Sequence, residues 1–399
     1  MAEDASHFAN LALFVKLHSS ELMEQTMLQV NSSRILQRPP EYDKPPKIRR
    51  RDALAALVAG LAIGTQARVL SGAGPRRSGM GLVTYCCQFQ RQRLRAENAG
   101  FDLFSPLNFL KHCQSLGAGG MQCGLGILPR EEIKFLQATA DKYQLYVEAI
   151  VKLPDNDADL DRFDKEMSTA KECRALAART TIIGGRRYEN YKSLTQFKEV
   201  EQRGVDMLLR GVKIAEKYKL PIAVENHKDQ RNSDRIALFK KISSEYVGAC
   251  LDTGNSIALL EDPLQTIKDF APWAHSVHLK DQSLAPHEDG FLLGDVPLGQ
   301  GSLNLQQMVE LIRKAKPHIR FSLELITRDP LLVPCLSPDY WSTFPDLPAY
   351  QLAATLRLVL EDRSENGQQI SAMTADEQLA REDQNIRESL EYAARELGI

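Results

Sequence analysis

Four apolar segments of the chain each end in a polar residue that can bind a metal ion. Their sequences are PIAVENHKD, VGACLDTGN, HSVHLKD and FSLELIT, and the four residues are Glu225, Asp252, His278 and Glu324. Three carboxylates and one imidazole form an oxygen-rich set that suits one divalent ion, Mn²⁺, Co²⁺, Mg²⁺ or Zn²⁺. A single residue of this kind is more often a helix cap or an ion-pair partner. Four of them at the ends of consecutive apolar segments predict a metal site.

The same residues could carry acid–base chemistry beside the metal. A proton α to a carbonyl is weakly acidic, so its removal needs a base and a stabilised enediolate. A divalent ion that binds the carbonyl and the adjacent hydroxyl supplies that stabilisation as a Lewis acid. We expect Glu225 and Glu324 to lie on opposite sides of the metal, where one takes the proton and the other returns it. Both glutamates are therefore candidate catalytic residues as well as ligands.

Short apolar or β-branched runs must position these side chains, and from residue 80 onward such runs alternate with helical stretches. The expected strands cover residues 81–85, 121–125, 145–150, 180–183, 222–225, 248–252, 276–278 and 321–325. Eight βα units in about 250 residues match the size of a (β/α)8 TIM barrel, an α/β fold. A doubly wound sheet is the alternative. Polar residues at successive strand ends favour the barrel, because its strands end around one shared mouth.

The predicted barrel covers residues 80–360 and follows an N-terminal extension, residues 1–79. Within that extension, residues 49–67 contain three consecutive arginines before a short apolar run. This pattern is typical of a twin-arginine signal, which would give an exported, periplasmic protein. The alternative is an ordinary N-terminal helix in a cytoplasmic protein. The apolar run is too short for a stable membrane span.

Two segments follow the predicted strands. Residues 331–350 are rich in proline and aromatic side chains and are expected to form an ordered loop over the barrel mouth. Residues 361–399 form a C-terminal helical extension with a charged helix over residues 375–397. We interpret this helix as a solvated cap, and a contact within a homo-oligomer is the alternative.

The order and spacing of several motifs resemble the xylose isomerase-like TIM barrels of the sugar phosphate isomerase/epimerase superfamily. The motifs are VENH, CLDTGN, HLKD, LGQG, SLE and, at residues 184–190, GGRRYEN, and the resemblance covers residues 80–360. In relatives with this pattern, the residues that match Glu225, Asp252, His278 and Glu324 bind the metal. The matching glutamates also exchange protons with the substrate in ketose epimerases.

By the same resemblance, Glu148, His227 and Lys280 are candidates for the substrate pocket. Arg186 and Arg187 offer guanidinium groups that could grip a phosphate or a carboxylate, or they could be solvated loop residues. We therefore add Arg186 to the candidate substrate-binding residues.

Two positions depart from the pattern of the ketose 3-epimerases. Those enzymes carry a histidine three residues after the metal aspartate and an arginine six residues after the metal histidine, whereas this chain has Asn255 and Leu284. The departures argue against ketohexose epimerisation. Asn255 is nevertheless a candidate substrate-binding residue. Because it also stands where the endonuclease IV branch has a metal histidine, it argues against that nuclease.

Composition narrows the choice of partners. With 43% hydrophobic and 26% charged residues, the 399-residue chain is typical of a soluble globular protein. Its net charge of −2 lacks the basic excess that nucleic-acid binding requires, so a small sugar or polyol is the expected substrate. Seven cysteines without a CxxC pair are interpreted as buried small residues rather than as a zinc site or disulfide framework.

Three functions are consistent with these residues. The prediction is an isomerase or epimerase that acts on a sugar or keto-sugar. A lyase, such as a dehydratase or a keto-glycoside-cleaving enzyme, needs the same enediolate and differs in the group that leaves next. The third hypothesis is a non-catalytic sugar-binding protein. The presence of both Glu225 and Glu324 argues against it, because binding alone does not require both.

Overall fold

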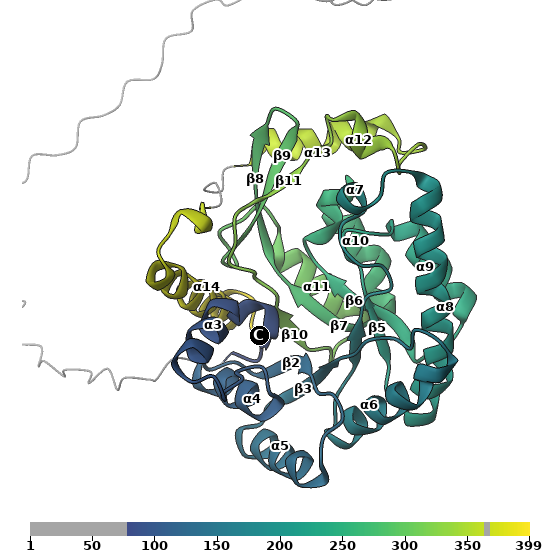
Figure 1. Cartoon of the computed structure of the whole chain (residues 1–399). Helices are drawn as coiled ribbons and strands as arrows, with labels where there is room; N and C mark the ends of the chain where they lie inside the picture. Colours follow the sequence, from purple (N-terminus) through teal and green to yellow (C-terminus); the bar gives the residue numbers. More distant parts are fainter. Residues whose placement is uncertain (1–77, 363–367) are drawn as a thin grey trace, which may run out of the picture. The chain divides into compact units, whose positions relative to one another are not determined.

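The computed structural model describes residues 78–362 and 368–399, which contain a closed barrel of eight parallel strands (Figure 1). Around the barrel, the strands are β1 (Gly81–Val83), β10 (Phe321–Leu323), β7 (Ala274–Leu279), β6 (Val247–Asp252), β5 (Ile222–Glu225), β4 (Ala178–Thr180), β3 (Tyr146–Ile150) and β2 (Gly120–Gly124). The closed order confirms the predicted (β/α)8 fold over the doubly wound alternative. The signal-like segment 49–67 lies outside the described residues.

Each of the eight predicted strands has a counterpart in the barrel, but the fourth one is displaced. It was expected over residues 180–183, whereas β4 covers Ala178–Thr180. The apolar signal misled the prediction, because Ile182 and Ile183 are buried just after the strand has ended. The displacement matters for the site, because it puts Arg179 inside a barrel strand, paired in register with Ala223 of β5.

Helices connect the strands on the outside of the barrel, and their ends follow familiar capping chemistry. At the start of the long helix α8, the Ser193 side chain accepts a hydrogen bond from the Gln196 N–H, and Asn304 does the same for α11. The connecting helices are α3 (Gln88–Glu97), α4 (Pro106–Ser115), α5 (Arg130–Tyr143), α6 (Leu160–Glu172), α7 (Arg187–Asn190), α8 (Leu194–Tyr218), α9 (Asn232–Ile242), α10 (Pro263–Phe270) and α11 (Leu305–Ala315). Short 3₁₀ turns are η2 (Thr84–Cys87), η3 (Asp157–Asp159), η4 (Asn255–Leu259), η5 (Ala271–Trp273) and η6 (Ile370–Ala372).

A buried tyrosine ties three barrel strands together. The Tyr146 hydroxyl of β3 accepts a hydrogen bond from the Gly81 N–H at 2.9 Å and donates one to the Phe321 carbonyl at 2.6 Å. Glycines of β1 and β2 make room for the ring, because a Cβ at Gly81 or Gly120 would collide with it. The closure of the barrel between β1 and β10 is thus held by a polar contact as well as by the parallel ladder.

A second, three-stranded sheet stands at one end of the barrel (Figure 1). The hairpin of β8 (Asp281–His287) and β9 (Gly290–Val296) was not predicted, and β11 (Leu331–Val333) pairs with β9. The predicted loop over residues 331–350 therefore contains a strand, followed by α12 (Pro338–Trp341) and the start of α13 (Ala349–Glu361). A small separate core of Leu284, Phe291, Val333 and Tyr340 holds this layer together.

The C-terminal helix α14 (Ala375–Glu396) packs against α3 rather than standing free (Figure 1). Its Glu382 carboxylate accepts hydrogen bonds from the Phe89 and Gln90 N–H groups at 2.9 and 2.8 Å, so it caps the first turn of α3. Ile386 and Leu390 are buried against the barrel. The helix therefore caps this side of the barrel through an apolar face.

All seven cysteines lie among the described residues, where they are buried and free, as the sequence predicted. The part of the chain that the structure describes contains no helix with the length and apolarity needed to cross a membrane.

Candidate metal centre

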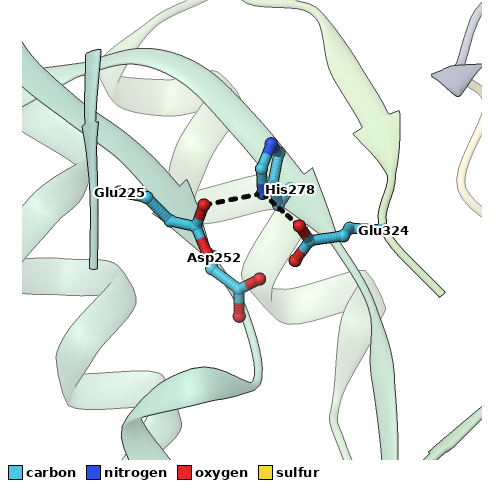
Figure 2. A group of neighbouring side chains, drawn as sticks. All are labelled: Glu225, Asp252, His278 and Glu324. Atoms are coloured by element: carbon cyan, nitrogen blue, oxygen red, sulfur yellow. Dashed lines mark ion pairs between the residues drawn. The ribbon is translucent and has the colours of Figure 1, made fainter. Parts of the chain in front are cut away.

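The four predicted ligands come together at the carboxyl ends of adjacent strands (Figure 2). Glu225 ends β5, Asp252 ends β6, His278 lies near the end of β7, and Glu324 directly follows β10. The parallel register places Asp252 beside His278. All four side chains are buried, which is unusual for three carboxylates unless a cation compensates them.

The spacing of the four side chains fits one divalent ion. Each offers one ligand atom, and these atoms all lie within 4.8 Å of one another. Ligand atoms on opposite sides of an ion are about 4.2 Å apart when each bond is about 2.1 Å. A small inward movement of the side chains would therefore bring all four into bonding distance.

The orientation of His278 fits a metal ligand. Its Nε2 lies 2.7 Å from the Gln122 Oε1, an oxygen that can only accept, so Nε2 carries a proton and donates it. Its Nδ1 faces a Glu225 oxygen at 3.6 Å and a Glu324 oxygen at 3.4 Å and has no hydrogen-bond partner (Figure 2). A buried ring nitrogen aimed at two carboxylates without a hydrogen bond is where a cation would bind.

Further buried polar residues of the barrel strands support His278. Gln122 of β2 donates from Nε2 to Glu148 of β3 at 2.8 Å and to the Ser276 hydroxyl at 3.1 Å. The same hydroxyl donates to Glu148 at 2.7 Å, and burial raises the pKa of this carboxyl group. Gln122 is therefore fixed from two sides, which orients the imidazole through its hydrogen bond to Nε2.

Two cations hold the glutamates. Arg179 of β4 donates from Nε to Glu225 Oε2 at 2.7 Å, and the Lys280 ammonium lies 2.8 Å from Glu324 Oε2. The same ammonium lies 3.1 Å from Asp252 Oδ2. Although burial acts to raise the pKa of Glu324, Lys280, His278 and Arg179 together outweigh it and lower that pKa well below its usual range. The glutamates are thus ionised and ready to bind a metal.

The conformation of the CLDTGN segment aims one oxygen of Asp252 at the centre. Asp252 Oδ1 accepts hydrogen bonds from the backbone N–H groups of Gly254 at 2.9 Å and Asn255 at 2.8 Å, so Oδ2, beside the Lys280 ammonium, is the oxygen that a metal ion would bind. Burial raises the pKa of Asp252 to about 6. Asn255 also donates from Nδ2 to Glu225 Oε1 at 3.1 Å, so this loop orients two ligands.

A cavity of about 510 Å³ opens beside the four residues, and Glu225 and Glu324 form part of its wall. Three of the predicted substrate-binding residues, Arg186, His227 and Lys280, also line it. Glu148 and Asn255 do not: Glu148 lies behind His278, and Asn255 lies between Glu225 and Lys228. Their direct contact with a substrate stays a prediction.

Several residues of the site were not predicted from the sequence: Gln122, Arg179, Lys228 and Arg328. Arg187, in contrast, lies apart from this cavity. Its guanidinium stacks on the rings of Phe197 and Phe344 at 3.8 and 4.1 Å and donates to the Thr343 carbonyl. Arg187 is therefore neither a solvated loop residue nor part of the cavity wall.

The HLKD and LGQG motifs belong to one structural unit. The Asp281 carboxylate accepts four backbone hydrogen bonds, from Gln282, Gly299, Gly301 and Leu303, at distances between 2.9 and 3.1 Å. Gly299 has a φ of +85°, a conformation that favours glycine. The loop before α11 thus folds around Asp281, next to Lys280.

Comparisons with known proteins agree with this architecture. The family model described as xylose isomerase-like TIM barrel matches residues 110–347. The 3-oxo-isoapionate decarboxylase of Pectobacterium atrosepticum is 31% identical over 111 residues, which cover 27% of this chain and 40% of that protein.

Two solved structures resemble the fold. One is a xylose isomerase-like TIM barrel protein from Mycobacterium smegmatis in complex with magnesium, with a TM-score of 0.46 and 15% sequence identity. The match covers 63% of this chain and 89% of that protein's chain. The other is a D-psicose 3-epimerase in the presence of D-fructose, with a TM-score of 0.49 and 12% sequence identity. The match covers 75% of this chain and 95% of that protein's chain.

Proposed function

The chain belongs to the xylose isomerase-like TIM barrel family, and we propose that it is a divalent-metal-dependent enzyme that acts on a keto-sugar through an enediolate. One observation carries the proposal: ligand atoms of Glu225, Asp252, His278 and Glu324 lie within 4.8 Å of one another, and the two glutamates form part of the wall of a cavity large enough for a sugar. The unpartnered Nδ1 of His278 supports a metal at their centre.

The bound ion would supply Lewis acidity to the carbonyl and the adjacent hydroxyl of the substrate. The protein supplies the rest. Gln122 and Arg179 orient His278 and Glu225, so little rearrangement is needed when the ligands bind the ion. Glu225 and Glu324 both reach the cavity and are the groups that would take a proton from the substrate carbon and return it. Transfer to another carbon is isomerisation, and return to the other face is epimerisation.

A lyase outcome is the second candidate, and two observations favour it. The curated relative with 31% identity is a decarboxylase, although the matched segment spans only 40% of its length. In addition, Arg179 donates a hydrogen bond to one carboxylate oxygen of Glu225 and Asn255 donates to the other, and the Lys280 ammonium forms an ion pair with Glu324. Carboxylates held in this way are weak bases. Loss of carbon dioxide from a 3-oxo acid needs the same enolate stabilisation and no base to remove a carbon-bound proton.

Solvent exchange tests the proposal. The Mn²⁺-loaded full chain would be incubated in D₂O with a panel of keto-sugars and 3-oxo sugar acids, with NMR detection of deuterium on carbon and of released carbon dioxide. We expect deuterium at one carbon of at least one compound. Deuterium with retention of all carbons identifies an isomerase or epimerase, and deuterium with carbon dioxide release identifies a decarboxylase.

Two controls give the result its meaning. Removal of the metal by a chelator should abolish the exchange, and Glu324→Gln with metal bound should lower its rate at least about 100-fold, the lower range of a lost general base. Exchange that persists without metal, or unchanged turnover of the Glu324→Gln variant, would contradict the proposal.

A further inference from the structure

The wall of the 510 Å³ cavity contains more cationic side chains than are needed to neutralise the candidate metal ligands in it. Its cationic residues are Arg179, Arg186, Lys228, Lys280 and Arg328, and its carboxylates are Glu189, Glu225 and Glu324. Most of these cations have a carboxylate partner: Arg179 pairs with Glu225, Arg186 with Glu189, Lys280 with Asp252 and Glu324, and Arg328 with Asp295. Lys228 stands apart from this pattern.

Lys228 is a buried ammonium with a neutral partner. Only 3% of the residue is exposed, and its Nζ donates to the amide oxygen of Asn255. Among residues 78–362 and 368–399, no carboxylate forms an ion pair with it. Burial, followed by repulsion from Lys280 and Arg328, lowers the pKa of Lys228 to about 8, so the group is still largely charged at neutral pH. A buried charge without a counter-ion is costly unless a ligand compensates it.

The position of Lys228 is close to the reacting centre. Asn255 accepts from Lys228 through Oδ1 and donates to Glu225 through Nδ2, so one amide joins the ammonium to a candidate ligand. Lys228, Arg328 and both glutamates line the same cavity. A group bound by Lys228 would therefore belong to the same molecule that reaches the metal site.

The charge balance indicates what that group is. The five cations of the wall are balanced by its three carboxylates together with Asp252 and Asp295 behind it. A bound divalent ion would then leave an excess of two positive charges. A monoanionic substrate would leave one positive charge to stabilise the enediolate, whose proton would pass to Glu225 or Glu324, whereas a phosphate dianion would leave none.

We propose that the substrate is a keto-sugar acid whose carboxylate is bound by Lys228 and Arg328 beside the metal site. The proposal rests on the proposed function, since it assumes that the four-residue centre holds the metal next to this cavity. Lys228 provides the buried contact. Arg328 is half-buried and uses one guanidinium nitrogen for Asp295 at 3.0 Å, which leaves its other donors for the substrate.

Binding of three matched ketohexose derivatives tests the proposal. The Mn²⁺-loaded full chain would be titrated by calorimetry with D-fructose, D-fructuronate and D-fructose 6-phosphate, which differ only in the group on C6. We expect the sugar acid to bind at least tenfold more tightly than the neutral sugar and more tightly than the phosphate ester. Equal affinity for the acid and the neutral sugar, tighter binding of the phosphate ester, or no binding of the acid would overturn the proposal.

Variants identify the residue responsible. Lys228→Met should weaken binding of D-fructuronate by about 10- to 100-fold, as expected for a lost hydrogen bond to a charged group. It should leave the affinity for D-fructose and for Mn²⁺ within about threefold, in keeping with the usual additivity of independent contacts. The matched control is Lys213→Met, which removes an exposed lysine of α8. Unchanged affinity for the acid in the folded, metal-loaded Lys228→Met variant would overturn the assignment.

A second variant covers the case in which Lys228→Met does not fold. Arg328→Gln should also weaken binding of the acid but not of D-fructose, and unchanged binding of the acid would remove Arg328 from the site. These affinities are measured without turnover. A protein that binds Mn²⁺ and prefers the acid but exchanges no deuterium would therefore refute the proposed function and support the acid-binding site.

Discussion

Replacement of Gln122 by methionine should weaken metal binding without breaking the barrel. Gln122 is fully buried, accepts from His278 Nε2 at 2.7 Å and donates to Glu148 and Ser276. Methionine has similar length and no hydrogen-bonding group of comparable strength, so the imidazole would lose the partner that fixes its orientation. Loss of such a partner behind a ligating histidine typically lowers metal affinity by about 10- to 100-fold. At 25 °C this corresponds to about 1.4–2.7 kcal/mol.

The structure also limits the effect on folding. Glu148 would keep its hydrogen bond from Ser276 at 2.7 Å, so one buried N–H group of His278 is the main new unpaired donor. An unpaired buried donor costs about 1–3 kcal/mol. We therefore expect a lower melting temperature for the metal-free Gln122→Met variant, but a cooperative unfolding transition.

Isothermal titration of the metal-free protein with Mn²⁺ measures the affinity directly, and circular dichroism verifies the fold. Gln202→Met is the matched control, because Gln202 is exposed on α8 and its amide donates a hydrogen bond to Asp206 at 2.8 Å, away from the metal site. The control should bind Mn²⁺ like the unmodified chain. An affinity of the folded Gln122→Met variant within twofold of the unmodified chain would refute the view that Gln122 orients a metal ligand.

Three other predictions concern the centre and the loops around it. In the metal-free protein, burial acts to lower the pKa of His278, but the neighbouring Cys250, Glu324 and Glu225 outweigh it and raise that pKa well above 6.5. Metal binding must therefore displace a proton, and the Mn²⁺ affinity measured by titration should rise with pH by up to about tenfold per unit. An affinity that does not change with pH would contradict this prediction. Asp281→Ala removes the acceptor of four backbone N–H groups and should lower the free energy of unfolding in urea by about 2–4 kcal/mol. The buried Gln282 N–H would cost about 1–3 kcal/mol when unpaired, whereas water can replace part of the bonds to the part-buried Gly299, Gly301 and Leu303 N–H groups. A loss below about 1 kcal/mol would show that water replaces the carboxylate fully. Glu382→Ala removes the cap that α14 provides to α3 and should cost about 1–2 kcal/mol in the same assay, whereas unchanged stability would assign the contact between these helices to apolar packing alone.

The barrel was predictable because its signal is repeated. Eight apolar runs alternate with helices, and polar residues end the last four barrel strands, so errors of a few residues in single strands did not affect the fold. The β8–β9 hairpin was missed because one pair of strands has no such repetition. A signal was present: the pattern SLAPHEDGFLLGDV has Asp-Gly between apolar stretches, and the two strands are joined by the tight turn at Glu288 and Asp289.

The candidate ligands were predictable from their place at strand ends, but their partners were not. Arg179 was missed because the apolar run Thr181–Ile183 drew the expected fourth strand two residues too far along the chain. Gln122 gave a clearer signal, as a polar residue between Met121 and Cys123 in a buried strand. Lys228 gave none, because a lysine after a strand end is most often solvated, and only the folded chain shows it buried.

Anomalous diffraction from crystals grown with Mn²⁺ tests the central claim most directly. We predict one anomalous peak at the carboxyl ends of β5, β6, β7 and β10, at about 2.0–2.3 Å from an oxygen of Glu225, Asp252 and Glu324 and from Nδ1 of His278. The peak should be absent from crystals of the Asp252→Ala variant. A protein without a peak at this position, or with Mn²⁺ bound only elsewhere, would contradict the claim that these four residues form a metal centre.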